Sequence, residues 1–164
     1  NEMTSMLDSY VSFVKTESPE PIETIIINEL IGDIVKTIQK NSFDLVIYEK
    51  NTIQTSGRQI QLKRAFNNII DNSQRYATKI EINLYKNEKD CVIEFNDDGE
   101  GIHKDKYEDV FKPFFTLDPS RNKLKGESGL GLTITRDIIR SHGGDVKLSE
   151  SNLGGLQLKV LLPL

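Results

Sequence analysis

The sequence has one cysteine, no basic stripe and no apolar run long enough to cross a membrane, and each absence narrows its possible functions. Cys91 alone cannot form an internal disulfide, and no nearby histidine completes a zinc pattern with it. The net charge of −4 and the pI near 5.3 argue against nucleic acid as a partner. A membrane span needs roughly 18 apolar residues. We therefore expect one globular domain in a reducing, cytoplasmic setting.

The first residues form a unit of their own in our interpretation. Apolar residues recur at steps of three and four between residues 3 and 14, which predicts an amphipathic helix. Pro19 and Pro21 then end that helix. Because one amphipathic helix cannot bury its own apolar stripe, we assign residues 1–17 to a larger helical module. Residues 18–164 form the main domain.

The main domain alternates helical and extended periods. We predict strands at residues 22–27 and 45–48, a helix capped by Asn28, a longer helix at 58–76, a hairpin of residues 79–86 and 90–97, a short helix at 105–111, a helix at 129–142 and two strands around residues 154–155. Helices interleaved with hairpins indicate a two-layer α/β sandwich, in which helices cover one face of a mixed, mainly antiparallel sheet.

Three polar residues lie on one arc of the long helix. Asn68, Asn72 and Arg75 stand at i, i+4 and i+7, beside the apolar face. Amide oxygens are suited to Mg²⁺, which takes oxygen ligands and bridges to substrate phosphates, and Arg75 could contact the phosphate charge. The alternative is an ordinary solvated helix face, because this spacing is common.

A second group of candidate residues follows the hairpin. Asp97 ends the inward face of the second hairpin strand, so we expect its carboxylate to be buried. A buried carboxylate needs a hydrogen-bond donor, and the exocyclic amine of adenine is one. Gly99 and Gly101 let the chain turn tightly beside a flat base. The alternative is an ordinary Asx-type turn after a strand.

A glycine-rich loop at residues 126–131 precedes the last predicted helix. Exposed amides and the helix dipole bind phosphate at such a position, although a flexible hinge would use the same glycines. Before this loop, Lys112, Arg121, Lys123 and Lys125 add positive charge to a segment long enough to form a lid. A run of charges is more often solvated surface. Arg121 is our first candidate for a phosphate contact.

The aromatic residues and histidines near these loops are predicted to be structural. We expect Phe111, Phe114 and Phe115 to pack as a core cluster that anchors the base of the lid. His103 and His142 are expected on the surface near turns, and neither is expected to act as a nucleophile or a ligand.

Four motifs, taken together and in order, resemble the N, G1, F and G2 boxes of bacterial sensor histidine kinases. They are residues 62–76 (LKRAFNNIIDNSQRY), 97–101 (DDGEG), 111–115 (FKPFF) and 129–132 (GLGL). The likeness runs from about residue 21 to the end of the sequence and leans toward the osmosensor, EnvZ-like subgroup. It implies the Bergerat ATP-binding sandwich that histidine kinases share with Hsp90, gyrase B and MutL.

The resemblance implies a Mg-ATP site made by these motifs. Asn72 is similar to the Mg²⁺ ligand, Asn68 to its helix partner near the phosphates, and Asp97 to the adenine anchor. The lid is residues 112–128, where Glu127 and Ser128 depart from the Gly and Thr of many relatives. Arg121 is expected to act with the two asparagines in catalysis. The nucleotide-binding residues implied are Asn68, Asn72, Arg75, Tyr76, Asp97, Gly99, Gly101, Ile102, Phe114, Lys125, Ser128, Gly129, Leu130, Gly131 and Leu132.

The resemblance also implies transfer of the ATP γ-phosphoryl group to a histidine. Hydrolases of this fold have Glu four residues before the Mg²⁺-binding Asn, and Asn68 holds that position here. A neutral amide is a poor general base, so we expect transfer to a protein acceptor. The family's acceptor lies in a His-Glu/Asp motif of a dimerisation domain, and no such motif occurs in these 164 residues. Residues 1–17 resemble the end of that domain's second helix.

The partners implied are the histidine-bearing dimerisation domain and the receiver domain of a response regulator. The parent protein is expected to be a homodimer anchored in the inner membrane, with this domain in the cytoplasm. Two other functions stay open. One is a binding module that holds nucleotide without transferring phosphate, and the other is a hydrolase of the Hsp90 or gyrase kind, which Asn68 disfavours.

Overall fold

The computed structural model describes residues 20–38, 43–117 and 129–164, and the structural statements below concern these residues. The helix predicted at residues 3–14, and with it the unit assigned to residues 1–17, lies outside them. Most of the predicted lid, at residues 118–128, lies outside them as well.

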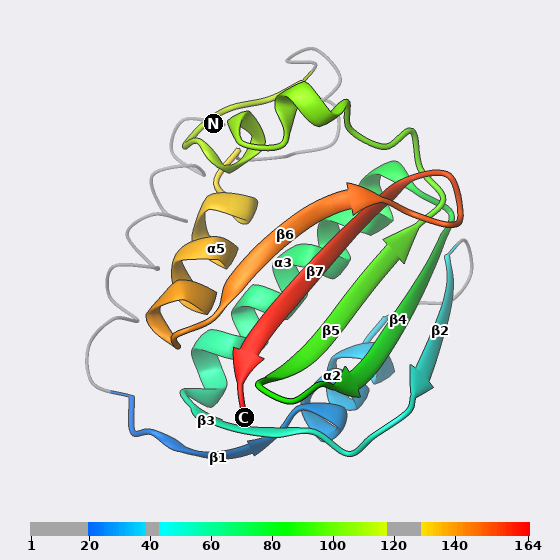
Figure 1. The fold of residues 1–164 in the computed structure, drawn as a ribbon. Coiled ribbons are helices and arrows are strands. Elements are labelled where there is room, and N and C mark those ends of the chain that lie inside the picture. Colours follow the sequence, from blue (N-terminus) through cyan, green and yellow to red (C-terminus); the bar gives the residue numbers. More distant parts are fainter. Residues whose placement is uncertain (1–19, 39–42, 118–128) are drawn as a thin grey trace.

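The described chain alternates strands and helices (Figure 1). In order they are β1 (Glu23–Ile26), α2 (Ile27–Lys36), β2 (Asp44–Glu49), β3 (Gln54–Gly57), α3 (Gln59–Tyr76), β4 (Lys79–Lys86), β5 (Asp90–Asp97), the short 3₁₀ helices η1 (Lys104–Lys106) and η2 (Asp109–Phe111), α5 (Gly131–Ser141), β6 (Asp145–Glu150) and β7 (Leu156–Pro163).

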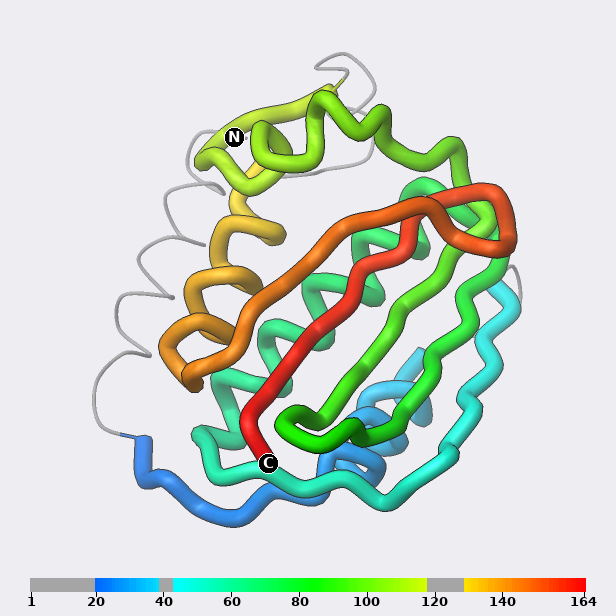
Figure 2. Tube along the Cα trace, in the orientation of Figure 1, coloured from blue at the N-terminus to red at the C-terminus, as the bar shows by residue number. Residues whose placement is uncertain are grey.

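The main sheet has the strand order β2-β4-β5-β7-β6. Only β2 and β4 pair in parallel, and the other neighbours are antiparallel. β1 and β3 form a separate antiparallel pair at the edge of the domain. The C-terminal end of β7 lies beside the β4–β5 turn, where Leu164 N donates to Lys89 O at 3.2 Å (Figure 2). The predicted mixed, mainly antiparallel sheet is therefore confirmed.

The helices α2, α3 and α5 cover one face of this sheet, and the core lies between the two layers (Figure 1). The apolar spacing of α3 explains its position, because Leu62, Phe66 and Ile70 share one side and are fully buried. Phe66 packs against Phe95 of β5 with ring centroids 6.2 Å apart. This contact holds the helix that carries the candidate asparagines against the strand that ends at Asp97.

Three predictions about local structure were wrong. Asn28 does not cap α2, because the helix already begins at Ile27. The segment 105–111 forms two 3₁₀ turns in place of one helix. The strand β3 was missed because its sequence, Gln-Thr-Ser-Gly, has no apolar alternation, and it is extended only because it pairs with β1.

Asn28 has a bridging role instead. Its Oδ1 accepts from Ile53 N at 2.8 Å, and its Nδ2 donates to Asn51 O at 2.9 Å and to Glu49 Oε1 at 3.0 Å. The side chain therefore ties α2 to the connection between β2 and β3. A long-range contact of this kind leaves no local sequence signal, since Asn also suits helix caps.

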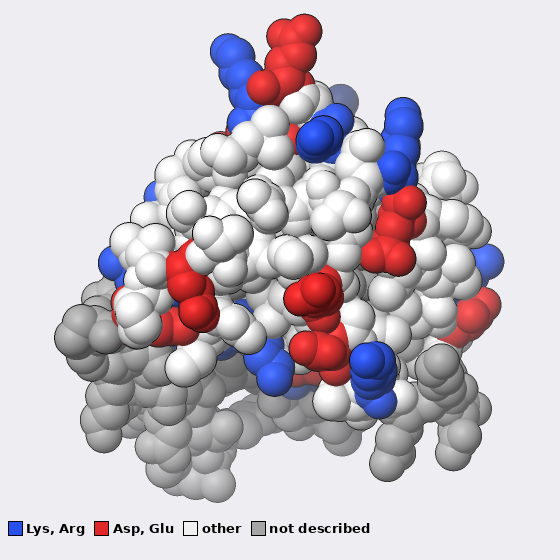
Figure 3. Space-filling model, turned by 90° about the horizontal axis from the view of Figure 1, so that it is seen from below, with Lys and Arg blue, Asp and Glu red and all other residues white. Residues whose placement is uncertain are grey.

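The underside of the domain carries acidic and basic side chains scattered over a largely uncharged surface (Figure 3). The outer face of the sheet is polar too. Tyr85 donates to Glu94 Oε2 at 2.8 Å, and partial burial together with this bond raises the pKa of Tyr85 to about 12. Among the described residues, no helix is long and apolar enough to cross a membrane.

Substituting Asn28→Ala should lower the free energy of unfolding by about 1–3 kcal/mol, because it leaves the Ile53 amide and the Asn51 carbonyl without their partner. The measurement is urea denaturation followed by circular dichroism. Asn152→Ala, in an exposed turn, is the matched control and should change little. Equal effects of the two substitutions would contradict the bridging role of Asn28.

Candidate functional site

A pocket of about 330 Å³ lies between the C-terminal half of α3, the loop after β5 and the start of α5. In Figure 1 this is the upper end of the domain, where these elements converge. Most of the predicted binding residues line it: Asn68, Asn72, Arg75, Tyr76, Asp97, Gly99, Gly101, Ile102, Gly129, Gly131 and Leu132. Motifs that are far apart in the sequence thus meet at one site.

Some predicted residues are not part of the pocket lining. Leu130 is only 1% exposed and belongs to the core, so it can contribute no side chain to the pocket. Phe114 is 51% exposed and does not line the pocket. Arg121, Lys125 and Ser128 lie outside the described residues.

Several lining residues were missed from the sequence. They are Asp71, Glu100, Val110, Thr116, Leu117 and Leu156, and Phe115, which was expected in the core, also lines the pocket. Asp71 had a usable signal, because it stands three residues after Asn68 and four before Arg75. Leu156 had none, because it reaches the site from the first position of β7, through sheet pairing.

Asp97 is the buried acid of the site. It is 8% exposed, and its Oδ1 accepts from Gly99 N and from Leu156 N, both at 3.0 Å. Burial raises the pKa of Asp97, and the two amide hydrogen bonds oppose that rise. Both amides bond to Oδ1, so neither uses Oδ2. The sequence left open whether Asp97 makes an ordinary Asx turn or faces a ligand site. The two alternatives are compatible, since Oδ1 closes an Asx turn and the residue still lines the pocket.

The β6–β7 turn comes very close to Asp97. Gly155 N donates to Asp97 O at 3.1 Å, and a Cβ at Gly155 would overlap Oδ1 of Asp97. Only glycine allows this approach, so Gly155 is part of the site although it is distant in sequence. On the other side, Asp98 accepts from Thr78 Oγ1 at 2.7 Å and from the amides of Thr78 and Lys79 at 2.9 Å. These contacts fix the loop after β5 to the connection between α3 and β4.

The polar face of α3 forms one wall of the pocket. Asn68 donates from Nδ2 to Gly131 O at 3.4 Å, a contact that does not use its amide oxygen. Asn72 lies one turn further along the same wall. Burial raises the pKa of Asp71, and the positive charge of Arg75 opposes the rise. This wall therefore offers two amide groups and a partly desolvated carboxylate.

The predicted core cluster of Phe111, Phe114 and Phe115 is right for Phe111 and for Phe115, which packs against the core, and wrong for Phe114. Phe111 is buried, Phe115 lines the pocket and Phe114 is exposed. Phe114 has a φ of 63°, a left-handed conformation that is rare for an aromatic residue, and its amide donates to Gly129 O at 2.9 Å. This bond brings the end of the segment after η2 next to the start of α5.

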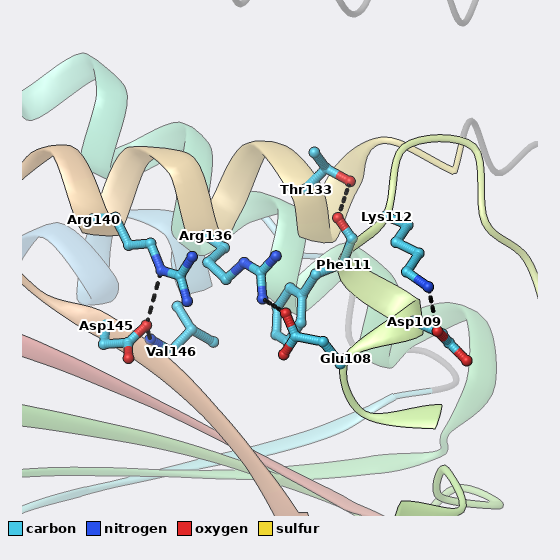
Figure 4. A network of polar contacts seen from close by, with 9 residues as sticks. All are labelled: Glu108, Asp109, Phe111, Lys112, Thr133, Arg136, Arg140, Asp145 and Val146. Atoms are coloured by element: carbon cyan, nitrogen blue, oxygen red, sulfur yellow. Dashed lines mark hydrogen bonds and ion pairs between the residues drawn. The ribbon is translucent and has the colours of Figure 1, made fainter. Parts of the chain in front are cut away.

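The segment around η2 is anchored to α5 by side chains (Figure 4). Thr133 Oγ1 donates to Phe111 O at 2.7 Å, and Arg136 Nη1 lies 2.7 Å from Glu108 Oε1. The Arg136 guanidinium also stacks over the Phe111 ring, 4.3 Å from its centroid. Lys112, predicted as a lid cation, pairs instead with Asp109 Oδ1 at 2.7 Å and does not line the pocket.

The site thus combines three kinds of binding group. A buried carboxylate stands at one end, amide side chains line a helix, and the first turn of α5 supplies a helix N-terminus at Gly131. A helix N-terminus favours anions, and a buried carboxylate favours a hydrogen-bond donor. A ligand with a base and phosphate groups fits this arrangement.

Comparison with known proteins agrees with this geometry. Residues 57–164 match the family model described as histidine kinase-, DNA gyrase B-, and HSP90-like ATPase. The chain belongs to this family. It corresponds to the ATP-binding catalytic part of sensor histidine kinases, as the family model and the curated relatives indicate.

Two curated relatives illustrate the match. The chain is 40% identical over 104 residues to the sensor histidine kinase CpxA of Escherichia coli, covering 63% of this chain and 23% of that protein. It is 29% identical over 148 residues to the histidine-protein kinase BaeS of Escherichia coli, covering 88% of this chain and 32% of that protein. The chain therefore spans a quarter to a third of the length of these relatives.

Solved structures show the same fold. The mycobacterial sensor histidine kinase MprB superposes with a TM-score of 0.76 at 22% identity, over 87% of this chain and 97% of that one. The catalytic domain of the histidine kinase ThkA gives a TM-score of 0.75 at 23% identity, over 87% and 95% of the two chains. The predicted two-layer α/β sandwich of this ATPase family is confirmed.

The buried acid of the pocket should make the free energy of unfolding depend on pH. Because burial raises the pKa of Asp97 above its ordinary value of 3.8, the folded state holds this proton more tightly than the unfolded state. The contribution of Asp97 to the free energy of unfolding should therefore fall as pH rises from 3.8 through the raised value. The measurement is denaturation of wild type and Asp97→Asn across this range. As pH rises, the free energy of unfolding of wild type should fall relative to that of the variant.

Asp98→Asn is the control for this experiment and should show the opposite slope. Hydrogen bonds led by the Thr78 hydroxyl hold the pKa of Asp98 below 3.8. The contribution of Asp98 to the free energy of unfolding is therefore present above pH 3.8. It is lost as pH falls through the lower pKa that Asp98 has in the folded state. A difference between wild type and Asp97→Asn that stays constant with pH would contradict the desolvation of Asp97.

Proposed function

We propose that this chain is the catalytic half of a sensor histidine kinase, which binds Mg-ATP and donates the γ-phosphoryl group to a histidine on another domain. One observation carries the proposal. Asp97, the amide wall of α3 and the first turn of α5 line a single pocket, so groups suited to a base and groups suited to Mg²⁺-bound phosphates are available to one ligand.

At the base end, Asp97 is the proposed anchor of adenine. Its Oδ2 would accept from the exocyclic amine, while the bonds to Oδ1 hold the carboxylate still. A hydrogen bond to a charged acceptor in a desolvated site is stronger than one in water. Gly99, Gly101 and Ile102 line the adjoining wall, where a flat base fits against backbone and one apolar side chain.

At the phosphate end, Asn72 is the proposed ligand of Mg²⁺ and Asn68 its neighbour near the phosphates. In the described part of the chain, no group of three or more His, Cys, Asp or Glu residues is close enough to hold a metal. An amide oxygen, ATP oxygens and water form a donor set that suits Mg²⁺, which would neutralise phosphate charge. Arg75, Tyr76 and the amides of residues 129–131 would hold the phosphates, with Arg121, Lys125 and Ser128 of the lid as further candidates.

The proposed reaction is transfer rather than hydrolysis. The bond between the γ-phosphorus and its bridging oxygen breaks, a bond to an imidazole nitrogen forms, and ADP is released. Asn68 supports this choice, since its neutral amide cannot remove a proton from water. The acceptor histidine would come from the dimerisation domain of the parent kinase or of a second chain.

The parent protein is part of the proposal as well. We infer that residues 1–17 are the end of the second dimerisation helix, and that the parent is a homodimer that passes its phosphoryl group to a response regulator. The EnvZ-like subgroup, a cytoplasmic location for this domain and an inner-membrane anchor for the parent rest on the sequence motifs. The relatives CpxA and BaeS support a sensor kinase of this general kind.

The test is phosphotransfer from γ-labelled ATP to a separately made dimerisation domain that carries its histidine. Wild-type chain should bind ATP and label the histidine. Asp97→Asn should weaken ATP binding tenfold or more, since a hydrogen bond to a charged group contributes about 1.5–3 kcal/mol. Asn72→Ala should reduce the Mg²⁺-dependent part of the affinity.

The outcomes separate the alternatives. Binding of ATP without labelling of any histidine would indicate a nucleotide-binding module that has lost transfer. Unchanged ATP affinity in both Asp97→Asn and Asn72→Ala would refute the pocket. Asn152→Ala, in an exposed turn of the described chain, serves as the control substitution.

Hydrolysis of ATP is a second candidate function, and Asp71 is the observation that favours it. Its carboxylate lines the pocket next to Asn72, and burial raises its pKa, which makes it a stronger base than an exposed acid. Asp71 could therefore activate water although Asn68 cannot.

Steady-state ATPase assays test this candidate. If Asp71 is a general base, wild type should turn over ATP without an acceptor, and Asp71→Asn should lose that activity by about 100-fold or more with little change in ATP affinity. We expect instead that wild type hydrolyses ATP slowly without an acceptor. Asp71→Asn and Asn68→Ala should then hydrolyse ATP at similarly slow rates. Fast turnover that depends on Asp71 would favour the hydrolase.

A further inference from the structure

His142 bridges the two helices that form the pocket. It ends α5, and its Nδ1 lies 2.7 Å from Ile138 O on the same helix. Its Nε2 accepts from Arg58 N, the residue before α3, at 3.0 Å. The expectation that His142 is simply a surface residue is therefore wrong, whereas His103 is exposed as expected.

The two hydrogen bonds define the chemical form of the ring. Arg58 N can only donate, so Nε2 must present a lone pair, and Ile138 O can only accept, so Nδ1 must carry the hydrogen. The imidazole is therefore neutral and protonated on Nδ1. No residue with a single polar atom can make both contacts.

Gly57 makes room for this ring. A Cβ at Gly57 would lie 2.7 Å from Cδ2 and 3.0 Å from Nε2 of His142. Gly57 does not have a positive φ, so its backbone conformation does not require glycine. The missing side chain instead serves the close approach of the imidazole to the start of α3.

The first backbone amides of α3 are hydrogen-bonded to residues outside the helix. Arg58, its N-cap residue, provides no side-chain cap, and the carboxylate of Glu20 accepts from Ile60 N at 2.6 Å and from Gln61 N at 3.2 Å. Glu20 ties α3 to the chain that precedes β1. His142 joins this end to the end of α5 by a hydrogen bond, beside the apolar packing of the two helices.

The two helices run in opposite directions, so His142 stands far from the pocket. Towards the pocket, two hydrogen bonds join α3 and α5, and both are long: Asn68 Nδ2 donates to Gly131 O at 3.4 Å, and Thr135 Oγ1 donates to Ala65 O at 3.5 Å. Asn68 is also a residue that the nucleotide would engage. The shorter bond at the distant end is therefore better suited to set how far α5 lies along α3.

We propose that His142 is a positioning residue of the ATP site. By holding the end of α5 at the start of α3, it sets the separation between Gly131 and the asparagines of α3, and so the fit of the phosphates. The proposal rests on the nucleotide-binding function inferred above. Adenine recognition at Asp97 is built from β5 and β7 and does not depend on this separation.

Two substitutions of His142 each keep one of its two hydrogen bonds and remove the other. In His142→Asn the amide nitrogen replaces Nδ1 and can still donate to Ile138 O, but no acceptor reaches Arg58 N. In His142→Gln the side chain is long enough to present an oxygen where Nε2 stood. His103→Asn, at the exposed histidine, is the matched control.

The experiment measures displacement of a fluorescent ATP analogue from the 164-residue chain by Mg-ATP and by adenosine. His142→Asn should weaken Mg-ATP binding by about three- to tenfold, the effect of one hydrogen bond, and should leave adenosine binding unchanged. His142→Gln and His103→Asn should stay within about twofold of wild type for both ligands.

Each result bears on the proposal. Equal loss of Mg-ATP and adenosine affinity in His142→Asn would mean that His142 only supports folding, and unchanged affinity for both would mean that it does not position the site. Either result overturns the inference. Failure of the wild-type chain to bind Mg-ATP at all would instead refute the proposed function.

Discussion

The hydrogen bonds from Gly99 N and Leu156 N to the carboxylate of Asp97 are the constraint on which the site depends. They join the end of β5, the loop after it and the start of β7 at one oxygen. Burying this acid has a cost, visible in its raised pKa. An amide of similar shape would accept from the same backbone groups without the charge, and this supports the proposal that a ligand uses the carboxylate.

The rest of the pocket is arranged around that acid by helix packing. Phe66 against Phe95 sets α3 on the sheet, and α5 then lies along α3 between Asn68 at one end and His142 at the other. The proposed phosphate end of the site is thus built from two helices, whereas the proposed base end is built from strands and turns. In the proposed site, a shift of either helix would therefore alter phosphate binding and leave adenine recognition intact.

Sequence periodicity was sufficient for the layers and for the faces of a few lining residues, and the resemblance to histidine kinases supplied most of the others. The spacing of Asn68 and Asn72 and the period-two pattern that ends at Asp97 predicted their faces correctly, because neighbouring backbone geometry decides them. Leu156, Gly155 and Asp71 were missed as site residues. The first two reach Asp97 only through strand pairing, and the third was overlooked although its spacing was informative.

The sequence by itself determined most of the helices and strands and the chemical groups that the chain offers, since these follow from local propensity and residue type. Only the tertiary structure decided which of those groups meet. It exposed Phe114 and paired Lys112 with Asp109, and it brought His142 to the amide of Arg58, 84 positions away. Contacts of that range depend on how the layers pack, and no local pattern in the chain encodes them.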